Sequence, residues 1–113
     1  MQPEQPAKLL RIHITESDRY QGKALYEAIV GKCRELQIAG ATVFRGLEGY
    51  GETAEMHKSR LVRHDQPILI TIVDSAENIA RLAPALEEMM DTGLMAVSDV
   101  KIARIRNAPR EGE

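Results

Sequence analysis

The spacing of apolar residues divides the chain into stretches with two different periods. Leu9 to Ile14 places apolar side chains at every second position, which predicts a strand with one apolar and one mixed face. From Lys23 to Leu36 the apolar positions recur at steps of three and four, which predicts an amphipathic helix. Gly31 lies inside that helix at a cost of about 1 kcal/mol relative to alanine, so either a partner packs closely there or the helix is locally weak.

Two further strands are separated by a long polar stretch. The segment from Ala41 to about Leu47 has the small, β-branched and aromatic residues of a strand. Ile68 to Val73 is apolar on both faces apart from Thr71, which predicts a central strand buried on both sides. The loop between them, residues 48–66, has about 19 residues, a length that in a compact domain is usually functional or mobile.

A second helix and a last strand complete the pattern. Asp74-Ser-Ala-Glu77 resembles a capping box at the start of the helix, and Pro84 inside the helix predicts a kink. Asp91-Thr-Gly93 ends the helix. Leu94 to Ile105 then predicts a strand with a bend or bulge at Ser98-Asp99, where polar residues interrupt the apolar positions.

The resulting order βαββαβ predicts an α+β fold, a ferredoxin-like sandwich. Its four antiparallel strands take the spatial order 4-1-3-2, and both helices lie on one face of the sheet. The other face of the sheet is left uncovered. Strand 68–73 has Leu69 and Val73 on one face and Ile68, Ile70 and Ile72 on the other, and an uncovered apolar face is most simply buried by another copy of the chain. The 113 residues are expected to form one domain, with residues 1–7 and 107–113 as polar tails.

The stretch from Gly40 to Gly51 has the layout of an anion-binding site. Its strand leads into a glycine-dense corner at Gly46, Gly49 and Gly51, where glycine permits positive φ and leaves backbone N–H groups accessible. Taken alone, the corner is equally compatible with a tight turn, and the residue type alone favours a solvated loop face for each basic residue after it. The candidates there for contact with phosphate or a partner are Lys58, Arg60 and Arg63.

Composition and charge exclude some functions and indicate the cellular compartment. The formal net charge of -2 does not favour bulk nucleic-acid binding, and Ile68 to Val73 lacks the exposed aromatic residues that the third strand of an RNA-recognition domain needs. The single cysteine, Cys33, suits a reducing compartment and is expected in the core. No apolar run reaches the roughly 18 residues of a membrane span. We therefore expect a cytoplasmic protein.

A resemblance to one protein superfamily covers about residues 8–106. It depends on five segments, which are Lys8–Ile12, Glu16–Tyr20, Gly40–Gly51, Asp91–Gly93 and Val97–Lys101. They resemble the nitrogen-regulatory PII signal proteins and, more closely, a PII-like group catalogued as domain of unknown function 190, an uncharacterised protein family. The resemblance implies a homotrimer of ferredoxin-like subunits that binds AMP, ADP, ATP or a related anionic molecule between subunits.

The same resemblance implies regulation without catalysis. Residues 48–66 correspond to the T-loop, which in PII-like proteins reports the bound ligand to a partner such as a transporter, channel or enzyme. No cofactor is required. The glutamine that follows the glycine corner in PII proteins has no counterpart, because Glu52 and Thr53 stand there, so sensing of 2-oxoglutarate is not implied.

Carried over position by position, the resemblance marks a set of ligand-binding residues. Thr42 matches the threonine near the adenine, and Gly93 matches the glycine of the B-loop. Lys101 lies near a phosphate-binding basic position. Arg104 and Arg106 have two interpretations. They either contact the phosphate of a ligand bound at a neighbouring subunit, or they place charge on an edge strand and so prevent its aggregation. The candidate ligand-binding set is Thr42, Gly49, Tyr50, Gly51, Gly93, Lys101 and Arg104.

Other functions stay open from the residues alone. A phosphatase-type enzyme would need a nucleophile beside a base, and of an acylphosphatase-like site only Arg19 is present. A structural or metal-tolerance trimer without nucleotide would share the same assembly. His57 and His64, with Asp65 adjacent, are weak evidence for a metal site, and none is predicted.

Overall fold

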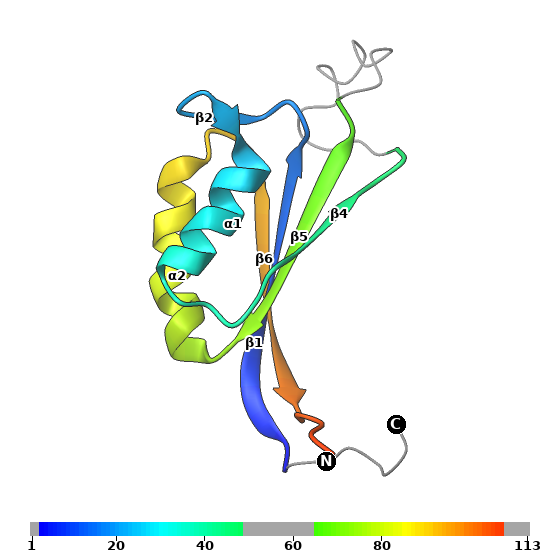
Figure 1. Cartoon of the computed structure of the whole chain (residues 1–113), viewed down its shortest axis with the longest axis vertical. Helices are drawn as coiled ribbons and strands as arrows, with labels where there is room; N and C mark the ends of the chain where they lie inside the picture. The colour runs from blue at the N-terminus through cyan, green and yellow to red at the C-terminus, as the bar shows by residue number, and fades with distance from the viewer. Residues whose placement is uncertain (1–2, 49–64, 108–113) are drawn as a thin grey trace.

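Within the described residues, a four-stranded sheet carries both helices on one side, and no helix lies on its other side (Figure 1). The computed structural model describes residues 3–48 and 65–107. The strands of the main sheet are β1 (Gln5–Thr15), β4 (Thr42–Arg45), β5 (Pro67–Asp74) and β6 (Leu94–Ile102). The helices are α1 (Leu25–Glu35) and α2 (Ala76–Met89).

The strand order of this sheet is β4-β5-β1-β6, and each neighbouring pair is antiparallel. Along the chain these are the second, third, first and fourth long strands, so the predicted ferredoxin-like order 4-1-3-2 is confirmed. The predicted central position of β5 is confirmed, but the prediction that it is buried on both sides is wrong within one chain. Ile68, Ile70 and Ile72 are buried on the helix side, whereas Val73 on the other side is 39% exposed.

The core lies between the sheet and the helices. Successive side chains of a strand point to opposite faces, so β1 turns Leu10, Ile12 and Ile14 toward the helices. Cys33 of α1 is buried here as expected, and burial raises the pKa of its thiol to about 11. The largest fully buried side chains are Leu10, Ile12, Leu25, Ile29, Ile68, Ile70, Ile72, Leu82 and Leu86.

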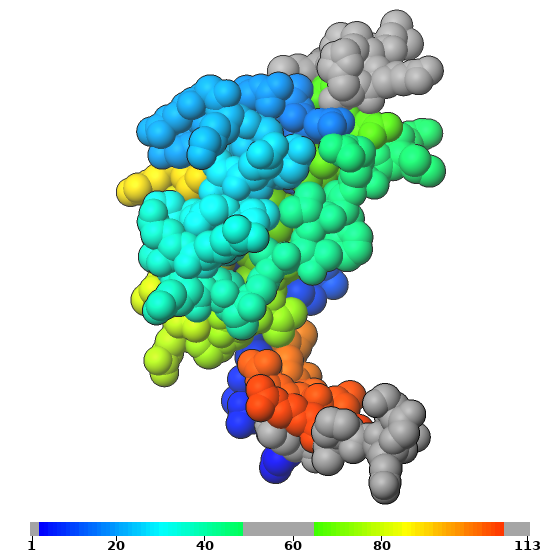
Figure 2. All heavy atoms as spheres, in the orientation of Figure 1, coloured from blue at the N-terminus to red at the C-terminus, as the bar shows by residue number. Residues whose placement is uncertain are grey.

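The first strand starts earlier than the sequence predicts. It begins at Gln5, so residues 5–7 belong to the sheet and not to a tail, and they pair with residues 100–102 of β6. We define these paired ends, residues 5–8 and 99–102, as the stalk. Figure 2 shows that the stalk projects beyond the helices as a narrow extension. Apolar periodicity could not predict it, because it has no helix to face.

The bend or bulge expected at Ser98-Asp99 is also wrong. The register between β1 and β6 runs without interruption from the Gln5–Ile102 pair to the His13–Leu94 pair. Asp99 lies opposite Lys8, and the two side chains form an ion pair. Ser98 and Asp99 therefore interrupt the apolar pattern of the sequence but not the pairing of β6 with β1. The strand ends at Ile102, before the expected end at Ile105.

A small hairpin precedes α1. Its strands are β2 (Arg19–Tyr20) and β3 (Lys23–Ala24), so the helix begins at Leu25 and not at Lys23. Gln21 and Gly22 connect the strands with φ of 50° and 81°, the two positive φ values that a two-residue type I′ turn requires. The Leu25 amide donates to the Asp18 carbonyl at 2.8 Å and joins the hairpin to the helix.

The start of α2 differs from the predicted capping box by one residue. The N-cap is Ser75, whose hydroxyl accepts a hydrogen bond from the Asn78 amide at 3.1 Å. The buried carboxylate of Asp74 instead accepts from the backbone N–H groups of Ala39 at 2.9 Å and Ser75 at 2.7 Å, and from the Asn78 side chain at 3.0 Å. Asp74 thereby fastens the connection after α1 to the start of α2.

Replacing Gly31 by alanine is expected to stabilise the protein by about 1 kcal/mol, because alanine restricts the unfolded chain and favours the helix. Gly31 is exposed in α1, and a Cβ added there meets no atom within 4 Å. Urea unfolding of the wild type and of Gly31→Ala measures the difference. Destabilisation by the alanine would indicate the alternative, a partner that packs on this face of the helix.

Candidate functional site

Gly93 lies where the turn after α2 enters β6, close against β1. Its φ of 127° is a value that side-chain-bearing residues rarely adopt. A Cβ at Gly93 would lie 2.9 Å from the His13 carbonyl oxygen and 2.8 Å from Cε of Met90. The fold therefore needs a glycine here for close packing, independently of any ligand.

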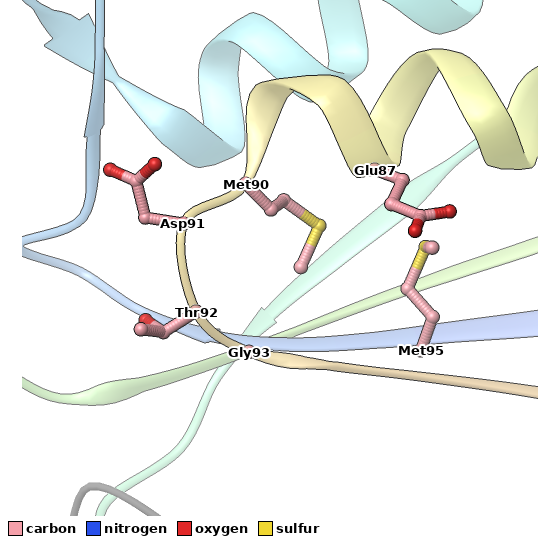
Figure 3. A pocket seen from close by; sticks show the side chains of 6 residues that line it. All are labelled: Glu87, Met90, Asp91, Thr92, Gly93 and Met95. Atoms are coloured by element: carbon pink, nitrogen blue, oxygen red, sulfur yellow. The ribbon is translucent and has the colours of Figure 1, made fainter.

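A shallow pocket of about 340 Å³ opens beside this glycine. Its volume is at the lower end of the range for small-molecule sites. The Met90 and Met95 side chains extend into the space below the end of α2, and in this view the carboxylates of Glu87 and Asp91 lie on opposite sides of Met90 (Figure 3). The residues that line the pocket are Glu87, Met90, Asp91, Thr92, Gly93 and Met95.

The chemistry of this pocket is apolar in the middle and acidic at its rim. Thioether side chains are polarizable and adapt to the shape of a planar ring, which suits contact with a nucleobase. Thr92 adds a hydroxyl that can donate or accept a hydrogen bond. None of the six lining residues is basic.

The base of the long loop lies at the same end of the sheet. The Gly46 amide donates to the Pro67 carbonyl at 2.8 Å, and a Cβ at Gly46 would lie 2.9 Å from Cγ of Pro67. The interpretation of Gly46 as a glycine with an accessible amide is therefore wrong. This amide continues the ladder between β4 and β5, so Gly46 has a packing role.

The turn after β1 holds both arms of that loop. Glu16 pairs with Arg45 on the outgoing arm at 2.7 Å, and its amide donates to the Gln66 carbonyl on the returning arm at 2.9 Å. The Ser17 hydroxyl donates to Asp65 at 2.6 Å. The sequence singles out Glu16 only as part of a polar turn, and nothing in its spacing identifies Arg45 as the partner, because the two residues meet only after the sheet forms.

The pocket and the loop base lie at the same end of the sheet, on opposite sides of β1. Leu94, the first residue of β6, pairs with His13, and Glu16 contacts the loop arms three residues later. Figure 1 shows the turn between α2 and β6 and the upper ends of β4 and β5 at the same end of the molecule. A ligand in the pocket would therefore lie at the same end of the sheet as the start of the loop.

The other predicted ligand residues do not meet at this pocket within one chain. Lys101 lies in the stalk opposite Pro6, eight residues along β6 from Gly93. At about 3.4 Å per residue of antiparallel strand, this places Lys101 roughly 27 Å from Gly93. Thr42 is exposed at the start of β4, on the helix-free side of the sheet.

Arg104 follows the stalk in the chain, and its positive charge contributes to lowering the pKa of Asp74. Burial alone raises the pKa of Asp74, but the hydrogen bonds from Ala39, Ser75 and Asn78 and the charge of Arg104 together outweigh it and lower that pKa. Arg104 itself is exposed. Within its own chain it therefore belongs to the end of the molecule opposite the pocket.

The remaining candidates lie outside the described residues. They are Gly49, Tyr50 and Gly51 of the glycine corner, the loop residues Lys58, Arg60 and Arg63, and the histidines His57 and His64. Within residues 3–48 and 65–107, no three His, Cys, Asp or Glu side chains gather as a metal site. None of the helices in these ranges is long and apolar enough to cross a membrane.

The helix-free side of the sheet exposes large apolar side chains. Phe44 is 50% exposed, Val73 39% and Leu94 55%. The register places Leu69 opposite Phe44 and Leu9 opposite Val73, on the same side. We call this surface the open face and define it as Leu9, Phe44, Leu69, Val73 and Leu94. Exposed large apolar side chains gathered on one side of a sheet are typical of an interaction surface.

Known sequences resemble the chain over most of its length. The family model DUF190, described as "Uncharacterized ACR, COG1993", matches residues 7–102. A UPF0166 protein of Aquifex aeolicus (strain VF5) is 37% identical over 99 residues, which cover 84% of this chain and 91% of that protein.

Solved structures resemble it in fold. CPII from Thiomonas intermedia K12, in a structure bound to ADP, AMP and acetate, has a TM-score of 0.67 at 19% identity, over 90% of this chain and 93% of that chain. A Thermus thermophilus protein described as a putative PII-like signaling protein has a TM-score of 0.64 at 20% identity, over 90% of this chain and 93% of that chain. The expected PII-like, ferredoxin-like fold is confirmed.

Proposed function

This chain belongs to the DUF190 family, and on that premise we propose that it is a PII-like regulatory protein without catalytic activity. It binds an adenine nucleotide and reports the bound state to a partner through residues 48–66. The observation that carries the proposal is the pocket beside Gly93, at the same end of the sheet as the base of the long loop. The binding of ADP and AMP by CPII, a protein of the same fold, supports this ligand class.

The complete site is formed between subunits of a homotrimer. Gly93 lies at one end of each chain and Lys101 and Arg104 lie at the other, so only a second copy could bring these residues to the same nucleotide. The open face supports such an assembly, because burying it removes large apolar side chains from water.

Ligand binding would act on the partner by changing the loop. A nucleotide that contacts the loop base in only one of its conformations shifts the population toward that conformation. The partner, a transporter, channel or enzyme, then contacts Lys58, Arg60 and Arg63. The Glu16–Arg45 pair is partly exposed and contributes at most about 1 kcal/mol, so it can open and close during such a change.

Isothermal titration with AMP, ADP and ATP is expected to show saturable binding to the purified chain. Ribose 5-phosphate is the matched control, because it offers an anion without the base. A nucleotide present at about 100 times its Kd stabilises the folded state by about 2.7 kcal/mol, so the thermal midpoint should rise with it. Sedimentation should give three times the chain mass of 12.6 kDa.

Two results would contradict the proposal. The absence of heat and of a thermal shift with all three nucleotides would contradict nucleotide binding and favour a trimer with another role. A chain that sediments as a monomer, with and without ligand, would remove the subunit interface on which the complete site depends.

A further inference from the structure

The pocket beside Gly93 has an unusual charge for a site that would receive phosphates. Two of its six lining residues, Glu87 and Asp91, carry carboxylates, and none of the six carries a cation. Phosphate groups in proteins are usually met by arginine, lysine or backbone N–H groups. The described lining therefore repels polyphosphate at close range.

Three basic side chains of the described residues are engaged elsewhere or lie far from these carboxylates. Arg45 is engaged with Glu16 at 2.7 Å, and Lys8 is paired with Asp99 in the stalk. Lys101 also lies in the stalk, at the far end of β6. If a second copy supplied its Lys101 and Arg104, their two positive charges would be balanced by Glu87 and Asp91.

We propose that this site selects adenine nucleotides of low phosphate charge, with the monophosphate bound more tightly than the triphosphate, and that Glu87 and Asp91 determine this preference. The inference rests on the proposed nucleotide-binding function and adds its selectivity. Met90 and Met95 provide contact area for the base, which all three nucleotides share, so they do not discriminate among them.

The physical basis is electrostatic repulsion between the two carboxylates and the phosphates, which increases from AMP to ADP to ATP. Each further phosphate adds roughly one negative charge at neutral pH. At a separation of about 8 Å and an intermediate effective dielectric constant, one carboxylate weakens the binding of one added charge by about threefold to tenfold. The effect should decrease at high salt, because both carboxylates are exposed and are screened by ions.

The test compares the AMP and ATP affinities of the wild type with those of Glu87→Gln, Asp91→Asn and the double variant, in low salt with EDTA present. These substitutions keep side-chain size and remove only charge at exposed positions, and thermal midpoints check that folding is retained. Glu88→Gln is the matched control, since Glu88 is an exposed neighbour on α2 that does not line the pocket.

In the wild type, AMP is expected to bind at least about threefold more tightly than ATP. Each single variant should raise the affinity for ATP by about threefold to tenfold with a smaller change for AMP, and Glu88→Gln should leave the ratio unchanged. A wild type that binds ATP as tightly as AMP, or variants that leave the ratio unchanged, would overturn the selectivity while nucleotide binding stands.

A divalent cation provides the second arm of the test. If Glu87 and Asp91 held Mg²⁺ for a triphosphate, adding Mg²⁺ would tighten ATP binding in the wild type and not in the double variant. That result would overturn the inference, because the carboxylates would then attract the triphosphate. A wild type that binds no nucleotide under any condition would contradict the proposed function and this inference together.

Discussion

Replacing Gly93 by alanine is expected to lower the free energy of unfolding by about 2–3 kcal/mol, a loss typical of forced backbone strain and steric overlap. At a φ of 127°, alanine is strained whatever space surrounds it. The new Cβ would also lie 2.9 Å from the His13 carbonyl oxygen, which belongs to the backbone of a central strand and cannot rotate away. Urea unfolding at neutral pH measures the loss.

Gly40→Ala is the matched control for this experiment. Gly40 is exposed, its φ is not positive, and a Cβ added there meets no atom within 4 Å. The control should change stability by no more than about 0.5 kcal/mol. If Gly93→Ala is as stable as Gly40→Ala, then the close packing against β1 does not contribute as described, and Gly93 would be explained by ligand contact alone.

Replacing Asp74 by alanine is expected to destabilise the fold by about 2–3 kcal/mol, the range for hydrogen bonds to a charged group. The carboxylate accepts three hydrogen bonds, from Ala39, Ser75 and Asn78, and it is only 9% exposed. Its removal leaves the Ala39 amide without this acceptor and loosens the connection after α1. Chemical denaturation again measures the change.

Asp99→Ala is the control, because it removes a carboxylate that takes part in a surface ion pair with Lys8. The Asp99 side chain is 85% exposed, so its loss should cost less than about 1 kcal/mol. Equal effects of the two substitutions would indicate that the hydrogen bonds of Asp74 contribute no more than an ordinary surface pair.

The same carboxylate of Asp74 makes stability depend on pH in a defined direction. The folded state lowers the pKa of Asp74 below its ordinary value of 3.8, so the ionised form is the one that stabilises the fold. Its contribution is fully present above the unfolded pKa and is lost as the pH falls through the folded pKa. The stability difference between the wild type and Asp74→Asn should therefore be constant from about pH 5 to 7 and shrink below about pH 4.

The predicted site residues show where sequence reasoning reaches its limit. The sequence assigns Gly93 to a ligand because a glycine in that turn resembles a B-loop, and the structure adds a packing reason that periodicity cannot contain. Gly46 is predicted as part of an anion-binding corner, yet its amide is engaged by Pro67. Glycine in a sequence indicates that space or positive φ is needed, but it does not say whether a ligand or the protein itself occupies the space.

The sequence by itself determined the order of the four long strands and two helices, the sheet topology and the inward face of β1, because a period of two or of about 3.6 residues reports directly which side chains avoid water. It did not determine the inward face of β5, whose residues are apolar on both faces. Only the tertiary structure decided the start of β1 at Gln5, the regular pairing of Asp99, and the contact between Glu16 and Arg45. These features depend on residues that are distant in the sequence and meet through backbone hydrogen bonds or charge. Such partners leave no periodic signal in either segment alone.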